Sequence, residues 1–553
     1  MSEKWQSALH VYKARREGTS PEFQAGLDKH NRESIAGWKI LRMAALMILL
    51  GIVTWFALPG PPDPVNLTYE IDLAEAEIGD LVITIIAEGN LPGKLDLQFP
   101  PGVFTDHQNG VYAHTPTASA LDDQGLPLKP LAIEKTLNGW KVSTGGTKRA
   151  GFIYHVGLNR VKGQELDVRR HISSPIRGGV RMAGFEIFVQ PVGLPVDDIT
   201  VAMHNPDDLP LLVPWPALVT GSDLMAERSR KLAARRAHLG QGQGFVPEGE
   251  TGPREVTDRS PHTTQVPDNV FYSPRDLADL NNSLLICGDL VTSTSQARNT
   301  VIQLATDTEW SFTHQAAMDL VRRIARTEIG FFGSAPSPQI TVILAVNEIT
   351  GREKFDVYGV HTGSSILVML EPGTTWGMLE EHASSVIAHE MFHGWLGEAI
   401  PQSDPQMLWF TEGATTWYAA RMLTAAGIWD PDYARAVLDA RLEKDYTLSP
   451  VKTQMSIADA AAKLMAKPVQ IRFAYAGGVK ACMGLDQMLA EATGRERPLD
   501  EVLRYLYDNR DGTPLTRQSF VAAVQAVTGV DCNQWLNDNV YKKTTLPAVI
   551  RVI

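Results

Sequence analysis

The feature that most constrains this chain is the run HEMFH at residues 389–393, followed after eighteen intervening residues by Glu412. Residues four apart lie on one face of a helix, so His389 and His393 can direct their imidazoles at one metal ion. With Glu412 as a third ligand, a fourth position stays open to water, as in catalytic zinc sites. We therefore expect one Zn2+ per chain. Two packed histidines of a buried helix are the alternative, which the downstream glutamate disfavours.

Two further residues would complete a hydrolytic site. Glu390 lies beside the open coordination position and is the candidate general base. Tyr475, in FAYAGG at 473–478, is the candidate donor to the oxyanion, because the glycines after it would let its helix or turn approach the site closely. A tyrosine packed in the core is the alternative interpretation.

Two helices are expected to carry the ligands. The first should begin near Thr374 or Thr375, whose hydroxyls can cap it, and run to about Leu396. The second, which carries Glu412, should end near Gly427.

Length, charge and cysteine content limit the remaining possibilities. A chain of 553 residues exceeds a single core and predicts roughly three folding units. The net charge of -12 argues against a nucleic-acid partner. The three cysteines are odd in number and widely spaced, so they indicate no disulfide framework.

An apolar run near the N-terminus predicts a single transmembrane helix over 39–58. Basic residues precede this run and acidic sequence follows it, so the arm 1–38 is expected in the cytoplasm. This places the chain in the cytoplasmic (inner) membrane as a single-pass protein, with its catalytic domain extracytoplasmic. A cleaved signal peptide is the competing interpretation.

Composition divides the rest of the chain into four segments. Short runs rich in Val, Ile, Phe and Tyr predict an all-β domain over 63–216. Residues 217–282 are polar and Gly-rich in their centre and are expected to form a linker or mobile insertion. Strands mixed with helices predict an α+β catalytic domain over 283–450, in which SLLICGDLV, QITVILAV and SSILVMLE are strands. Residues 451–553 are helical by pattern.

Three segments, HEMFHGWLGEAI, LWFTEGATTWY and YAGGVKACMGLD, together resemble the glycyl aminopeptidase family of gluzincin metallopeptidases. The resemblance implies an N-terminal β domain, a thermolysin-like catalytic domain and a helical C-terminal part. It also implies that His389, His393 and Glu412 hold zinc, that Glu390 acts as base and acid, and that Tyr475 stabilises the oxyanion. The leucyl-type aminopeptidases share the H-x-W-x-G continuation and the same glutamate spacing, and are the second candidate.

The chain departs from this family in two places. Such aminopeptidases usually carry a glutamate on the strand before the zinc helix, where it binds a substrate's ammonium group, but YGVHTG at 358–363 offers His361 instead. Exopeptidase and endopeptidase action therefore both stay open. The family's chains commonly end in a PDZ domain, whereas the sequence after the last predicted helix leads us to expect none. Gly359, His361, Gly363 and Ser364 are the candidate substrate-binding residues, and the strand 364–370 is expected to pair with an extended peptide.

The resulting hypothesis is a membrane-anchored zinc metallopeptidase that hydrolyses peptide bonds in peptides or unfolded proteins. One alternative is a catalytically silent peptide-binding or scaffold protein that retains the gluzincin fold. Another is a zinc hydrolase of a non-peptide substrate. The presence of all three ligands and of Glu390 favours an enzyme over a scaffold. The sequence specifies no oligomeric state.

Overall fold

The computed structural model of the chain describes residues 63–100, 112–158, 172–218, 269–307, 310–347, 357–463, 467–543 and 546. The secondary structure described below belongs to the compact unit Pro64–Ile553. The expected transmembrane segment 39–58, and most of the expected linker, lie outside the described residues. Within the described ranges, no helix combines the length and the apolar character that crossing a membrane requires.

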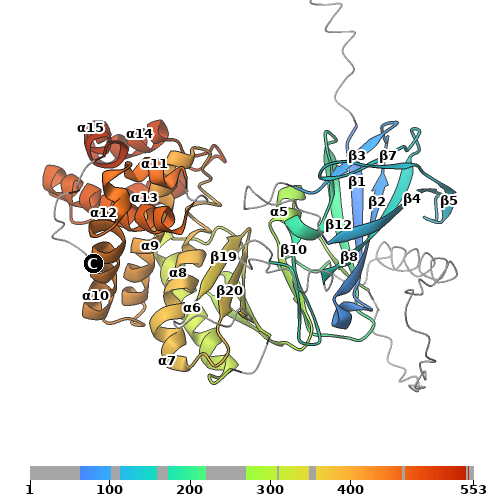
Figure 1. The fold of residues 1–553 in the computed structure, drawn as a ribbon, viewed down its shortest axis with the longest axis horizontal. Helices are drawn as coiled ribbons and strands as arrows, with labels where there is room; N and C mark the ends of the chain where they lie inside the picture. The colour runs from blue at the N-terminus through green and yellow to red at the C-terminus, as the bar shows by residue number, and fades with distance from the viewer. Residues whose placement is uncertain are drawn as a thin grey trace, which may run out of the picture. The chain divides into compact units, whose positions relative to one another are not determined.

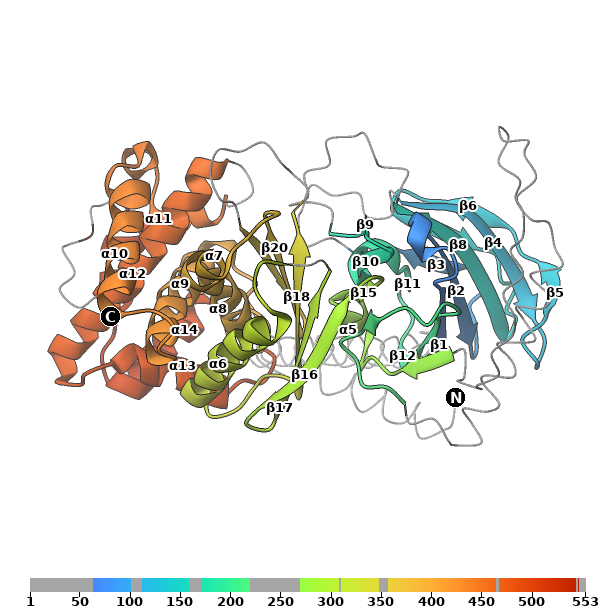
Figure 2. The same cartoon turned by 90° about the horizontal axis from the view of Figure 1, so that it is seen from below.

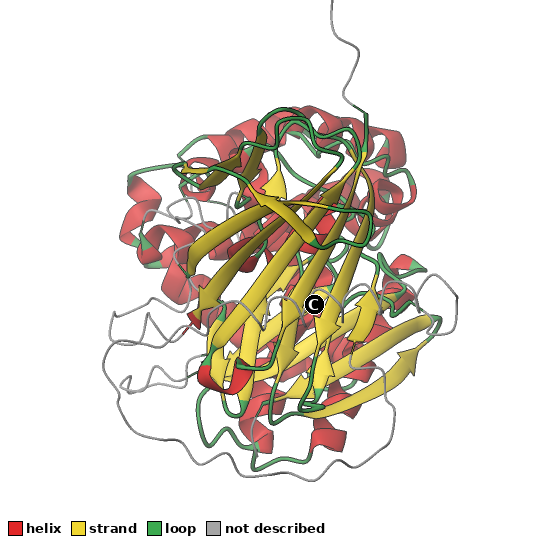
Figure 3. Ribbon diagram, turned by 90° about the vertical axis from the view of Figure 1, so that its right-hand side faces the viewer, coloured by secondary structure: helices red, strands yellow, loops and turns green. Residues whose placement is uncertain are grey.

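The N-terminal part is built from strands, as expected, and forms three sheets (Figures 1 and 3). The seven-stranded sheet has the order β14-β12-β1-β2-β8-β4-β5, with bounds Asn269–Tyr272, Val196–His204, Val65–Asp72, Asp80–Glu88, Arg149–Gly157, Ala113–Leu121 and Pro127–Pro130. One four-stranded sheet has the order β11-β3-β7-β6, with bounds Gln190–Pro191, Leu95–Gln98, Gly139–Val142 and Ile133–Lys135. The other has the order β13-β15-β10-β9, with bounds Leu211–Leu212, Leu284–Cys287, Gly179–Ala183 and Ser174–Ile176. Short helical segments η1 (Ala76–Ile78), α3 (Gly184–Ile187) and α5 (Leu277–Asn281) accompany these strands.

Two further strands belong to these N-terminal sheets. β14 lies inside the expected linker 217–282 and pairs antiparallel with β12, so the end of that segment is ordered rather than a linker. β15, which lies in the SLLICGDLV segment, pairs antiparallel with β10. The expectation that SLLICGDLV belongs to the catalytic sheet is therefore wrong. Because all four residues of β15 are buried and apolar, the pattern identifies a buried strand without specifying which sheet contains it.

The catalytic sheet has five strands in the order β16-β17-β18-β20-β19, with bounds Val291–Ala297, Thr300–Thr306, Gln339–Val346, Ser365–Leu370 and Tyr358–Thr362. Its two faces pack against different partners (Figure 2). Val342 and Leu344 belong to the core formed with the helices, whereas Ile343 and Ala345 belong to a cluster with β10 and β15 residues. Burial on both faces explains why β18 and β20 are almost continuously apolar.

The helix with the HEMFH run is a continuous stretch composed of α7 (Trp376–Met378), the π-helical segment η3 (Leu379–Ala383) and α8 (Ser384–Phe392). The expected start is confirmed, because the Thr375 hydroxyl accepts a hydrogen bond from the main-chain N–H of Met378 at 3.3 Å. The helix ends at Phe392 rather than near Leu396, since the chain turns there and reaches Gly397 at φ 138°.

The remaining elements are helical, as expected after Pro431. They are η4 (Pro405–Met407), α9 (Leu408–Ala425), α10 (Pro431–Arg441), η5 (Leu442–Thr447), η6 (Pro450–Thr453), α11 (Ile457–Ala461), α12 (Pro468–Thr493), α13 (Pro498–Asp508), α14 (Arg517–Thr528), α15 (Asn533–Leu536) and η7 (Asn537–Tyr541). Together with α6 (His314–Phe332), they share one hydrophobic core that includes residues from Ala297 to Leu546. Residues on both sides of the expected boundary at 450 therefore pack into the same core.

Candidate metal centre and active-site cleft

Three side chains from two neighbouring helices converge on one point. His389 lies in the last turn of α8, His393 caps that helix, and Glu412 lies in the first turns of α9. The two Nε2 atoms of the histidines are 3.1 Å apart, and they lie 3.3 and 3.5 Å from Oε2 of Glu412. Donor atoms bound to one tetrahedral zinc ion at its usual bond lengths are separated by about 3.3 Å. The three side chains therefore fit a zinc ion.

The outer nitrogens of both imidazoles have partners that fix the ring orientation. Nδ1 of His393 donates to the main-chain oxygen of Leu396 at 3.1 Å, and Nδ1 of His389 lies 3.3 Å from the hydroxyl of Thr416. With a proton on Nδ1, each ring directs the lone pair of Nε2 toward Glu412. This arrangement is the one that metal-binding histidines show.

The charges around this point also favour a cation. Burial raises the pKa of Glu412, but the imidazoles of His393 and His389 have a larger opposite effect and hold it below its usual range. Burial lowers the pKa of His393, but the carboxylates of Glu412 and Glu390 outweigh it and raise the pKa to about 9. Two negative carboxylates thus hold a positive charge between them, which is the role of a divalent metal ion.

Glu390, the residue after His389, lines one cleft together with His389, and we call it the main cleft. Burial raises the pKa of its carboxyl group, and the nearby imidazoles of His389 and His393 lower it to a smaller extent. Strand β19 passes close to this carboxylate, because a Cβ atom on Gly359 would lie only 2.7 Å from Oε1 of Glu390. Gly359 is therefore required by packing of the strand against α8, and it also lines the cleft.

Tyr475 on α12 reaches the metal centre through a close crossing of α9 and α12. A Cβ on Gly413 would lie 2.2 Å from the main chain of Gly478, so the two helices touch backbone to backbone. Gly413 follows Glu412, and Gly478 lies one turn after Tyr475. The phenol hydroxyl donates a hydrogen bond to Glu412, and its ring stacks on that of His389 at 5.9 Å. The predicted role of glycines in bringing Tyr475 to the site is confirmed at Gly478.

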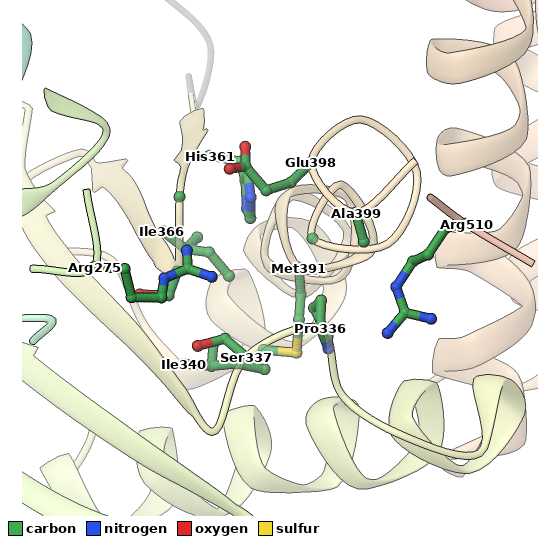
Figure 4. Close-up of a pocket in the computed structure, with 13 residues that line it drawn as sticks. Arg275, Pro336, Ser337, Ile340, His361, Ile366, Met391, Glu398, Ala399 and Arg510 are labelled. Carbon is green, nitrogen blue, oxygen red and sulfur yellow. The ribbon is translucent and has the colours of Figure 1, made fainter. Parts of the chain in front are cut away.

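His361, Gly363 and Ser364 do not line the main cleft. They line a second cavity of about 240 Å³ beside the end of α8 (Figure 4). The ring of His361 is 6.4 Å from that of His393, and burial together with the charge of His393 lowers the pKa of His361 to about 3. His361 is therefore neutral at physiological pH. It cannot replace the negative charge of a glutamate at this position.

The structure differs from the sequence-based expectation both for the strand expected to pair with a peptide and for two of the candidate substrate-binding residues. β20 lies between β18 and β19, so the strand 364–370 has no free edge; the free edge belongs to β19. Gly363 and Ser364 form the two-residue turn between β19 and β20. A Cβ on Gly363 would lie 2.3 Å from the main-chain oxygen of Asn282, so this glycine is needed for packing.

The main cleft has a volume of about 360 Å³ and contains charged residues that sequence analysis missed. Arg441 and Asp445 come from α10 and η5, and Arg472 comes from α12. Arg472 could have been found from its position three residues before Tyr475, on the same helix face. For Arg441 and Asp445 no local signal existed. The second cavity likewise contains Glu398 and Arg510, which had not been predicted.

Comparisons with known proteins agree with this geometry. Residues 339–538 match the peptidase family M1 domain. No curated protein shows significant sequence similarity to the chain. Among solved structures, an aminopeptidase N family protein from Idiomarina loihiensis has a TM-score of 0.65 at 15% identity, and the match covers 87% of this chain and 77% of that one.

An M1 zinc metallopeptidase from Deinococcus radiodurans gives a TM-score of 0.51 at 14% identity, over 89% of this chain and 96% of that one, as a mutant bound to a Tyr-Ser-Ala substrate. The same protein without a named ligand gives a TM-score of 0.51 with the same coverage. These likenesses support the order of an N-terminal β domain and a helical C-terminal region. With the match to residues 339–538, they confirm the expected gluzincin peptidase and its zinc cofactor. Residues 339–538 are therefore similar to the peptidase family M1 domain, and the chain is a zinc-dependent metallopeptidase.

Proposed function

We propose that this enzyme cleaves peptides in the cleft between α8, α10 and α12, with Glu390 as general base and Tyr475 as the donor to the oxyanion. The observation that carries the proposal is the set of three donor distances, 3.1, 3.3 and 3.5 Å, in a cleft that also contains Glu390 and Tyr475. Zinc held by these residues would supply a Lewis acid that acidifies water and polarises a carbonyl group.

The protein's own groups divide the remaining work. Glu390 accepts a proton from the attacking water and returns it to the leaving amine, which its buried position next to two imidazoles supports. The hydroxyl of Tyr475 donates to the carbonyl oxygen as negative charge develops on it. The peptide lies along the free edge of β19, which offers main-chain groups for pairing.

Two pockets at opposite ends of β19 suggest a direction for the bound peptide. Residues 357–359, at the start of the strand, line the main cleft, and His361, near its end, lines the second cavity. A peptide antiparallel to β19 would place its amino-terminal side in the second cavity. Glu398 is the carboxylate that lines this cavity, so it is the group we propose for binding a free α-ammonium in place of the neutral His361.

The finer sequence-based expectations belong to the same proposal. The three motifs resemble glycyl aminopeptidases, so we propose an aminopeptidase-like specificity. The apolar segment 39–58 supports a single-pass anchor in the inner membrane with the catalytic domain outside the cytoplasm.

The test is a comparison of wild type with Glu390→Gln. We expect about one zinc per chain in both proteins, and turnover of short peptides that falls by about 10² to 10⁴ in the variant. Metal content by elemental analysis and peptide cleavage by chromatography provide the measurements. Unchanged cleavage by the variant would show that the base lies elsewhere. A zinc-loaded wild type that cleaves no peptide, free or N-acetylated, would exclude the proposed activity.

A further inference from the structure

The outer wall of the main cleft carries an unbalanced positive charge. Arg441, Asp445 and Arg472 line this wall, and Nε of Arg472 lies 3.5 Å from Oδ1 of Asp445. Asp445 also attracts Arg441 through its charge, at a separation longer than an ion pair in the part of the chain that the structure describes. Two guanidinium groups thus share one carboxylate, so this wall keeps a net positive charge.

Helix periodicity explains why this charge faces the catalytic groups. Val437, Leu438, Arg441 and Asp445 are spaced as one face of a helix, and all four line the cleft. Arg441 also lies within electrostatic range of Tyr475. Apolar side chains also line the cleft, among them Val386, Trp429, Leu438 and Ile471.

Helix α12 sets the distance between the reacting carbonyl and this positive wall. Arg472 and Tyr475 are three residues apart on the same face, a rise of about 4.5 Å. An extended peptide advances by roughly 3.3 to 3.6 Å per residue. If Tyr475 binds the scissile carbonyl oxygen, a group that reaches the arginine wall belongs to the first or second residue after the scissile bond.

We propose that Arg441 binds a carboxylate on the first or second residue after the scissile bond. This inference rests on the proposed function and specifies its substrate class. The carboxylate comes either from the free C-terminus of a di- or tripeptide or from an acidic side chain. A guanidinium group recognises both sources with the same planar pair of hydrogen bonds. The apolar side chains that line the cleft accommodate an apolar side chain.

The experiment uses three peptides that differ in their carboxylates: Ala-Leu-Ala as the free acid, its C-terminal amide, and the C-terminal amide of Ala-Leu-Asp. For wild type we expect kcat/KM for the free acid to exceed that for the amide by about ten-fold, as for one charge-assisted hydrogen bond. The aspartyl amide separates the two sources, because a rate near that of the free acid shows that a side-chain carboxylate is also bound. A rate near that of the plain amide restricts the site to the C-terminus.

Arg441→Met should reduce the ratio of free acid to amide to about one. The matched control is Arg435→Met, since Arg435 lies on the same helix α10, is exposed, and pairs with Asp432 at 3.2 Å without lining the cleft. That control should keep the wild-type ratio. Melting curves verify that both variants are folded. In the Glu390→Gln background, calorimetric Kd values for the free acid and the amide measure the same preference without turnover.

The outcomes separate this inference from the proposed function. Equal kcat/KM for free acid and amide in wild type, or a ratio that Arg441→Met leaves unchanged, would overturn the carboxylate site while leaving the peptidase intact. Absence of cleavage for every peptide would instead remove the proposed function.

Discussion

At the scale of single residues, Tyr475 connects the metal centre with the reacting carbonyl group. Its hydroxyl donates to Glu412, and its ring lies against His389. Burial, followed by the charge of Glu412, raises the pKa of the phenol well above its ordinary value. The hydroxyl therefore keeps its proton, which it can donate in a hydrogen bond to a developing oxyanion.

Tyr475→Phe should lower kcat by about 10² to 10³ while KM and zinc content stay near those of wild type. The reason is that a donor to an oxyanion acts mainly in the transition state. Steady-state kinetics on one peptide and elemental analysis measure both quantities. Tyr505→Phe is the control, because Tyr505 is 38% exposed on α13 and should have no effect. An unaltered kcat would assign Tyr475 to packing alone.

At the scale of elements, the contact between α9 and α12 positions the site. A Cβ on Gly478 would lie 2.2 Å from the main-chain oxygen of Trp409 and 2.9 Å from Cα of Gly413. Backbone atoms cannot rotate away as a side chain does, so any residue larger than glycine must separate the helices. Separation would move Tyr475 away from Glu412.

Gly478→Ala should therefore destabilise the protein by about 1 to 3 kcal/mol and reduce kcat even below the melting transition. Gly484→Ala on the same helix is the control, because its Cβ would meet only the side chain of Trp535, at 3.2 Å. Thermal melting and peptide turnover at a temperature well below both transitions distinguish the two effects. A stable, fully active Gly478→Ala protein would contradict the close crossing.

Helix α6 carries a buried acid that the proposed mechanism does not use. Glu328 has no exposed surface, and among the described residues neither carboxylate oxygen has a hydrogen-bond partner. Burial raises its pKa well above the ordinary value. The folded state therefore binds a proton more tightly than the unfolded state. The stability contributed by binding this proton is fully present below the pKa that Glu328 has in the unfolded chain. It is lost as the pH rises through the pKa that Glu328 has in the folded protein.

Glu328→Gln removes this titration and keeps the shape of the neutral acid. Near pH 4.5 the variant and wild type should be similarly stable. Above that, the variant should gain relative to wild type by about 1.4 kcal/mol per pH unit until the folded pKa is reached. Melting temperatures at several pH values between 5 and 8 test this, with Glu491→Gln, at an exposed position of α12, as control. Parallel pH profiles for Glu328→Gln and wild type would show that the acid is not desolvated.

At the scale of the whole molecule, sequence analysis succeeded where the signal is local. His389, Glu390 and His393 follow from one helical period, and Glu412 from a spacing along the chain. The assignment of β15 to the catalytic sheet failed, because a short buried strand carries no information about its partner. Arg441 was missed for a similar reason: its position in the cleft depends on how η5, which continues α10, packs against α12, a contact between distant parts of the chain.

The packing of the shared core also predicts how the removal of zinc affects the stability of the fold. The helices that carry His389, His393 and Glu412 are anchored by buried apolar side chains such as Ile387 and Trp417, which belong to the shared core. This core does not depend on the metal. The metal adds stability only through its preferential binding to the folded state.

Dialysis against a chelator should therefore abolish peptide cleavage, leave the far-UV circular dichroism unchanged, and lower the melting temperature by roughly 5 °C. Added Zn2+ should restore both activity and melting temperature. His393→Ala should resemble the chelated protein, whereas His382→Ala, at an exposed position of the same helix, should retain zinc and activity. Loss of the helical signal on chelation would mean that the metal, rather than the shared core, holds α8 and α9 together.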